Sequence, residues 1–138
     1  MGYVVGDFDH AVREAQESSA CEKNYELPDG RKILVGAERF KCAETLFKPS
    51  LAGHDGMDGV HTYCNNSVQS CEEAIRADLY ANIVLSGGST LFEGMAERMW
   101  REMYALNPKE NKVAVLGPPE RLYSVWLGGS ILASMTSF

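Results

Sequence analysis

The sequence predicts a helix-rich α/β fold with a β-hairpin and short core strands. Several segments repeat apolar residues at helical spacing, which is the main sequence signal of an amphipathic helix. Two short strand-like segments flank a Pro28-Asp29-Gly30 turn, and other brief apolar runs are bounded by turn residues. The chain has 138 residues, of which 45% are apolar. This length accommodates one domain, or part of a larger one.

The first half of the chain is expected to contain a hairpin between helices. Residues 7–19 place apolar and charged side chains on opposite sides of a helix. In the hairpin, Tyr25–Leu27 is expected to pair with Lys32–Val35, because proline presets φ in the turn and Gly30 accepts a positive φ. Further helices are predicted over residues 37–47, 61–70 and 72–80, with a loop over residues 50–59.

The second half combines two short strands with two helices. A buried strand over residues 83–85 leads through a glycine-rich turn into a helix that begins near Gly94, and Asn107-Pro108 ends this helix. The helix is rich in methionine and is expected to pack in the core. The next strand is Val113–Leu116, and a final helix covers residues 123–138. Its Gly128-Gly129 pair suggests close approach to another backbone.

The charge balance excludes one class of partner. The formal net charge is −6, and both halves of the chain are acidic. Nucleic-acid binders need a basic face to neutralise phosphates, so a nucleic-acid role is not expected. No run approaches the roughly 20 apolar residues of a membrane span, and the N-terminus lacks the pattern of a secretory signal.

The cysteines contain no CxxC pair and are expected to be reduced, largely buried thiols. His61, Cys64 and Cys71 could share a helix face, so a zinc site is a minor alternative, as are disulfides. No metal site is predicted. The four cysteines are Cys21, Cys42, Cys64 and Cys71.

No persuasive catalytic set emerges from the sequence. His10, His54 and His61 lie far apart and are expected to be solvated or capping residues. Ser86 lacks the preceding glycine of a nucleophile elbow. The strand–SGGST–helix segment suits a phosphate or a sugar, because glycines let a ligand approach the backbone. On these residues alone, an ordinary tight strand-to-helix connection is the preferred interpretation, and no Walker lysine follows.

Five segments, taken in order, resemble the actin family. The strongest are YELPDG and the stretches DLYANIVLSGGSTLFEG and GPPERLYSVWLGGSILASMTSF, and YVVGDFD and ERFKCAETLFKPS also fit. The resemblance covers nearly the whole chain and implies an actin-like ATPase fold, related to ribonuclease H, in which two lobes close over ATP or ADP with Mg²⁺ or Ca²⁺. Residues 1–138 match the later part of the larger lobe, as a single partial domain carrying one side of the nucleotide cleft.

The resemblance also implies which residues meet ligands and partners. Leu122 stands where the family usually has a lysine against adenine, and Glu93 stands where proline is usual. The implied nucleotide-binding residues are Gly87, Gly88, Ser89, Thr90, Leu91, Phe92 and Leu122. The implied plug loop, which contacts neighbouring filament strands, has Leu51, Ala52, Gly53 and His54 at its tip, and the implied cleft for partners or filament neighbours contains Leu132, Met135 and Phe138.

The function implied by the resemblance is that of a cytoskeletal protein. Its partners would be other actin-like subunits and actin-binding proteins, in the cytoplasm and cytoskeleton, with the nucleus as a further location. The family's phosphate-gripping hairpins and cation-binding carboxylate are not in this sequence, so hydrolysis of ATP by the chain alone is not expected. Two alternatives are a short, ATPase-dead interaction subunit of a larger complex and, more remotely, an enzyme of the sugar-kinase and chaperone superfamily.

Overall fold

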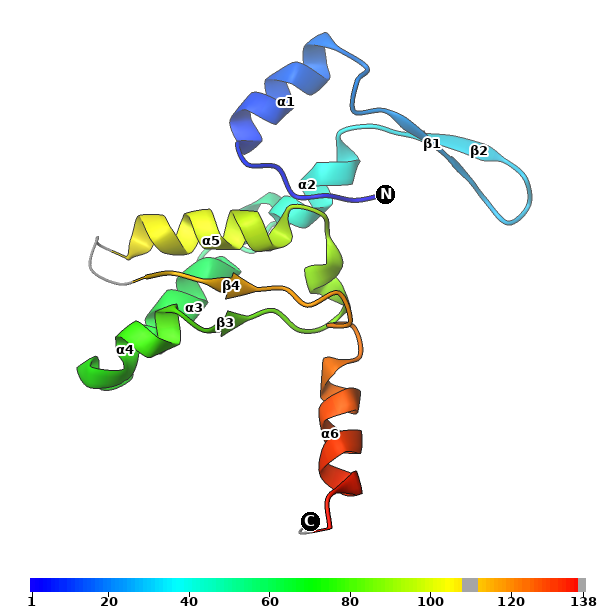
Figure 1. Cartoon of the computed structure of the whole chain (residues 1–138). Helices are drawn as coiled ribbons and strands as arrows, with labels where there is room; N and C mark the ends of the chain where they lie inside the picture. Colours follow the sequence, from blue (N-terminus) through cyan, green and yellow to red (C-terminus); the bar gives the residue numbers. More distant parts are fainter. Residues whose placement is uncertain (108–111, 137–138) are drawn as a thin grey trace.

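A computed structural model describes residues 1–107 and 112–136 (Figure 1). The described part is a mixed α/β structure in which helices predominate, as the sequence predicts. Its elements are α1 (Phe8–Glu17), β1 (Lys23–Glu26), β2 (Lys32–Val35), α2 (Glu38–Glu44), the 3-10 helix η1 (Pro49–Ala52), α3 (Val60–Gln69), α4 (Glu73–Tyr80), β3 (Ile83–Val84), the 3-10 helix η2 (Gly88–Leu91), α5 (Met95–Leu106), β4 (Val115–Leu116) and α6 (Ser124–Ser134).

The predicted hairpin is present, but its first strand lies earlier than expected. β1 and β2 pair antiparallel, with Tyr25 opposite Ile33. Leu27 belongs to the turn, where its N–H donates to the Arg31 carbonyl at 2.8 Å. Gly30 has a φ of 83°, as the turn prediction requires. The strand is therefore Lys23–Glu26 rather than Tyr25–Leu27, because the turn takes up one residue more.

The other strands are shorter than predicted. β3 and β4 form a two-residue parallel pair, in which Ile83 lies opposite Val115. The predicted strand Val113–Leu116 is thus confirmed only for Val115–Leu116. The loop predicted over residues 50–59 begins inside η1, which Gly53 ends with a φ of 79°.

The core is centred on α5, which packs against α3 and β4 (Figure 1). Met95, Met99 and Met103 are buried, so the prediction that the methionines belong to the core is confirmed. Trp100 and Tyr104 from the same helix lie outside it, with ring centroids 5.4 Å apart. The buried hydrophobic cluster also contains Val4, Ala43, Phe47, Val68, Tyr80, Ile83, Leu85 and Val113.

A buried ion pair joins α2 to α5. Both carboxylate oxygens of Glu44 accept hydrogen bonds from Arg98 at 2.9 Å. The same guanidinium donates to Glu102 at 2.6 Å and to the Val5 carbonyl at 2.8 Å. Burial alone lowers the pKa of Arg98, but the hydrogen bonds to Glu44 and Glu102 outweigh it and raise that pKa above its ordinary value. Through these hydrogen bonds, α5 binds both the N-terminal segment and α2.

The last helix, α6, extends away from this core (Figure 1). It has no buried residue, and Val125 and Trp126 are 82% and 70% exposed. A Cβ added at Gly128 or Gly129 would meet nothing within 4 Å. The predicted close approach of another backbone at this glycine pair is therefore wrong for the described part of the chain. Helix α6 ends at Ser134, earlier than the predicted residue 138.

Candidate functional site

The strand–glycine–helix segment forms a tight connection from β3 to α5. Gly87 has a φ of 87° and a ψ of 161°, a backbone conformation that is essentially open to glycine alone. The chain then enters η2, where the Thr90 side chain donates to the Gly87 carbonyl at 2.7 Å. Gly88 and Ser89 are exposed at the surface of the connection. The chain can turn here because residue 87 is glycine, which alone adopts this backbone conformation readily.

Arg121 clamps this connection to the segment that follows β4. Its guanidinium donates to the Thr90 carbonyl and hydroxyl, at distances between 2.9 and 3.2 Å. The Nη1 atom also donates to the carbonyls of Gly117 and Pro118, at 3.0 and 2.9 Å. The Gly87 N–H donates in return to the Arg121 carbonyl at 2.9 Å. Sequence reasoning missed this role, because spacing alone does not show that residues 90 and 121 meet.

The clamp places Leu122 beside the glycine-rich connection. A Cβ added at Gly88 would lie 3.2 Å from Leu122 Cδ1, so the two residues are neighbours. Leu122 is 46% exposed and Leu91 is 41% exposed. The result is a solvent-facing surface with an uncovered backbone at Gly88 and an apolar side chain next to it. We call Gly87–Leu91 together with Leu122 the glycine-rich surface.

Phe92 lies elsewhere. Its ring packs against the core cluster and faces Gly2, where an added Cβ would come within 2.7 Å of Phe92 Cε1. Glu93 pairs with Tyr3 as a parallel bridge, and the Val4 N–H donates to the Glu93 carbonyl at 2.8 Å. The structure thus brings the implied nucleotide residues 87–91 and Leu122 together and directs Phe92 toward the N-terminal segment.

The implied plug loop is exposed along residues 50–58. Leu51 is 49% exposed, and Met57, which sequence reasoning did not single out, is 54% exposed. Pro49, Ala52, His54 and Met57 line a shallow hollow with Val60 and Tyr63. This loop therefore presents more apolar surface than its tip sequence suggests.

The implied partner cleft is only partly described. Leu132 and Met135 are each 50% exposed at the end of α6. Phe138 lies outside the described residues. Both described members are accessible.

The histidines differ from one another. His10 is exposed and lies 3.9 Å from Glu14, and His54 is also exposed. His61 packs against Phe47, with ring centroids 5.7 Å apart, and its Nδ1 atom is buried without a hydrogen-bond partner. The prediction of a solvated or capping residue is wrong for His61. Burial lowers the pKa of His61, and the positive charge of Arg98 lowers it further. The nearby carboxylates raise this pKa but do not outweigh burial.

The four cysteines are free thiols. Cys42 is exposed, so the prediction of largely buried thiols is wrong there, whereas the other three are half-buried. Burial raises the pKa of Cys64. Within residues 1–107 and 112–136, no group of three His, Cys, Asp or Glu side chains is placed to hold a metal ion, and His61, Cys64 and Cys71 form no such group.

The described elements define a helix-rich α/β protein with a glycine-rich connection between a parallel strand pair and its central helix. A protein-family model described as Actin matches residues 3–138. The chain belongs to the actin family. Across the part of the chain that the structure describes, no helix is both long and apolar enough to span a membrane.

Proposed function

We propose that this chain is an actin-type structural protein that supplies one wall of an ATP- or ADP-binding cleft and joins other actin-like subunits. The observation that carries the nucleotide part is the glycine-rich surface held by Arg121. Membership of the actin family supports the cytoskeletal part, and with it a place in the cytoplasm, the cytoskeleton or the nucleus.

The glycine-rich surface has the features that a nucleotide needs on one side. At Gly88 no side chain separates a ligand from the backbone, so phosphate or ribose oxygens can approach closely. Leu122 offers an apolar face on which a purine can pack, but no charge for a cation–π contact. Arg121 preorganises both parts, since a single side chain bonds to segments on either side.

The divalent cation fits this chain less well. The described residues place no cluster of carboxylates or histidines that could hold it. A nucleotide cleft that uses the glycine-rich surface would therefore take its cation ligands from outside these residues. We expect the chain alone to bind nucleotide weakly and not to hydrolyse it, because phosphoryl transfer depends on positioned charges.

Amide NMR of the isotope-labelled chain tests the nucleotide proposal. Titration with Mg-ADP should give saturable shifts at Gly87–Leu91 and Leu122, whereas inorganic phosphate should affect a smaller set. Leu122→Ala should weaken binding about fivefold, because apolar contact with the base is lost. Leu34→Ala, at an exposed leucine of the hairpin, is the matched control. Unchanged spectra at Gly87–Leu91 with saturating Mg-ADP would reject the nucleotide wall.

Cosedimentation with actin filaments tests the second half of the proposal. Leu51 is exposed in the implied plug loop, so Leu51→Asp should reduce the amount of chain that pellets with filaments. Ile75→Asp, at a similarly exposed residue of α4, should leave pelleting unchanged. Equal loss with both variants, or pelleting that neither changes, would argue against a contact through this loop.

A second function, an ATPase-dead interaction subunit, is favoured by one feature. Leu122 removes the cation that the family places against adenine, and α6, which has no buried residue, offers apolar contact area. Retained filament binding without any nucleotide shifts would support this function over the first. Leu122→Lys should then fail to create nucleotide binding, whereas in a true cleft wall it should tighten binding.

A further inference from the structure

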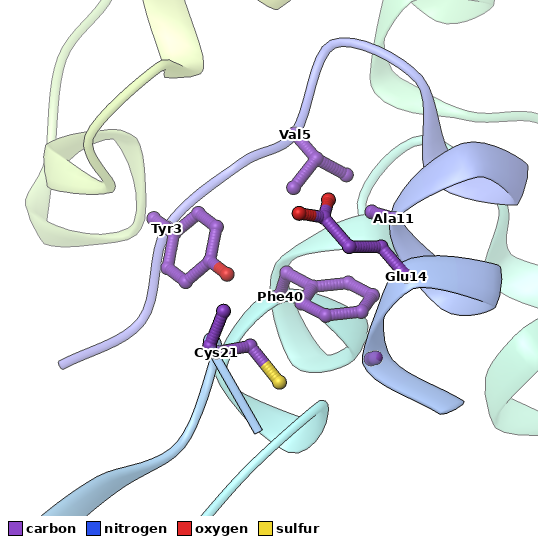
Figure 2. Close-up of a pocket in the computed structure, with 8 residues that line it drawn as sticks. Tyr3, Val5, Ala11, Glu14, Cys21 and Phe40 are labelled. Atoms are coloured by element: carbon purple, nitrogen blue, oxygen red, sulfur yellow. The ribbon is translucent and has the colours of Figure 1, made fainter. Parts of the chain in front are cut away.

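A cavity of about 220 Å³ lies between the N-terminal segment, α1 and α2 (Figure 2), and none of its lining residues belongs to the glycine-rich surface. Tyr3 and Val5 border it from the N-terminal segment, and Phe40 borders it from α2. Ala11 and Ala15 line it from α1, where their small side chains, one helical turn apart, leave the space open. Ala20 and Cys21, from the segment that follows α1, complete the lining.

The size and walls of the cavity suit a single aromatic ring. A dry apolar cavity of about 150 Å³ admits benzene, so 220 Å³ accommodates a ring with a short chain. The Tyr3 and Phe40 rings lie 6.0 Å apart at their centroids and are tilted by 54°. The two rings therefore pack against each other, and a ligand ring in the cavity beside them can make edge or face contacts with this pair.

One end of the cavity is acidic. Glu14 is the charged residue among its lining side chains, and Figure 2 shows its carboxylate directed from α1 over Phe40 toward Tyr3. Its described partner, His10 Nδ1, lies 3.9 Å away, which is too far for a strong hydrogen bond. The Glu14 carboxylate is thus open to a donor.

The cation that stacks on a cavity residue, Tyr3, is engaged elsewhere. Arg39 stacks over the Tyr3 ring at 4.9 Å, and its guanidinium donates to the carbonyls of Met1 and Cys21 at 2.9 and 2.6 Å. Arg39 does not line the cavity. A ligand cation would therefore meet Glu14 without displacing an existing ion pair of that carboxylate with arginine.

We propose that this cavity is a binding site for a compact aromatic amine, with the ring packed beside Tyr3 and Phe40 and the ammonium group at Glu14. The site is independent of the proposed nucleotide function, since it shares no residue with the glycine-rich surface. Because Glu14 is largely exposed, the charge contributes modest selectivity and the apolar cavity contributes most of the affinity.

Three probes with the same phenylethyl body test the proposal by amide NMR of the full chain. Phenethylamine carries a cation, 2-phenylethanol is neutral, and 3-phenylpropionate is an anion. All three should shift the amides around Ala11, Ala15 and Phe40, and phenethylamine should bind about threefold more tightly than 2-phenylethanol. Glu14→Gln should abolish this preference while leaving the neutral probe unaffected. Glu17→Gln, which changes a charge of α1 that does not line the cavity, should preserve the preference.

A cavity-filling variant supplies the second arm. Ala15→Leu should remove the shifts from all three probes, whereas Ala77→Leu, at an exposed alanine of α4, should leave binding as in the parent chain. The unliganded spectrum of each variant reports whether it is folded, and Ala11→Leu replaces Ala15→Leu if that variant is not. Shifts confined to other residues, undiminished binding to a folded filled variant, or no preference for the amine would each overturn the proposal.

Discussion

The two longest apolar helices of the C-terminal half meet opposite environments. Helix α5 has 12 residues and buries Met95, Met99 and Met103 against α3 and β4. Helix α6 has 11 residues and is more apolar on average than α5, yet none of its residues is buried. The difference lies in the distribution of side chains: α5 is amphipathic, whereas α6 is apolar on most of its circumference. A chain can thus complete one core and still leave an apolar helix without a described partner.

The largest effect is expected at the ion pair inside the α5 region. Arg98→Ala leaves Glu44, which is 1% exposed, as a buried charge with no arginine partner. This should lower the free energy of unfolding by about 3–5 kcal/mol, measured by urea denaturation. The double variant Glu44→Met with Arg98→Met removes both charges and should recover most of the loss. If the double variant were as unstable as Arg98→Ala, the buried charge would not be the cause.

Truncation of apolar side chains compares the two helices directly. Met103→Ala, at a fully buried side chain, should cost about 3 kcal/mol by leaving a cavity. Ile131→Ala on α6, where the side chain is 63% exposed, should change stability by less than about 0.5 kcal/mol. Thermal or urea unfolding measures both. Equal losses would show that α6 is packed against the core in solution.

The exposed face of α6 should govern self-association rather than stability. Trp126→Glu removes the exposed aromatic side chain of this helix, so it should reduce concentration-dependent aggregation. Light scattering and sedimentation velocity measure the change, and the unfolding free energy should stay within about 0.5 kcal/mol of the parent value. Tyr25→Glu on the exposed hairpin is the comparison variant and should have a smaller effect. If Trp126→Glu self-associates as much as the parent chain, α6 is not the surface through which the chain aggregates.

The smallest effect is expected from pH and concerns His61 beside the α5 core. Burial lowers the pKa of His61 below its usual 6.5, so the unfolded chain binds this proton more readily than the folded one. The contribution of neutral His61 to the unfolding free energy is therefore fully present above about pH 6.5. It is lost as the pH falls from the pKa of His61 in the unfolded chain toward its lower pKa in the folded chain. The shifted carboxylates Asp7, Asp29 and Glu38 titrate at lower pH. His61→Gln should flatten the pH dependence of the unfolding free energy below about pH 6.5, and an unchanged slope would assign that dependence to other groups.

Much of the fold follows from local patterns. The methionines of α5, the turn at Gly30 and the order of helices were predictable, because they depend on periodicity and on the conformational freedom of glycine. The buried role of Glu44 was not, because a glutamate in a short helix has the sequence pattern of a solvated residue. Its partner Arg98 lies 54 residues later, and only the tertiary fold brings the two together.

The candidate site shows the same division. The glycine-rich turn could be predicted from the sequence SGGST, since the backbone there needs glycine at position 87. The clamp by Arg121 joins residues 31 positions apart, and no spacing rule indicates it. The exposure of α6 could not be predicted either. Apolar residues at helical spacing predict a buried face, but they do not show which surface covers that face.

Native-state hydrogen exchange of the purified chain tests this contrast most directly, since it reports the stability of each helix separately. Amides of α5 around Met99 and Met103 should exchange only through global unfolding. Amides of α6 between Trp126 and Leu132 should exchange much faster, through local opening of a helix that is not held by the core. Equal protection of the two helices would contradict the contrast and show that α6 is packed against a surface in solution.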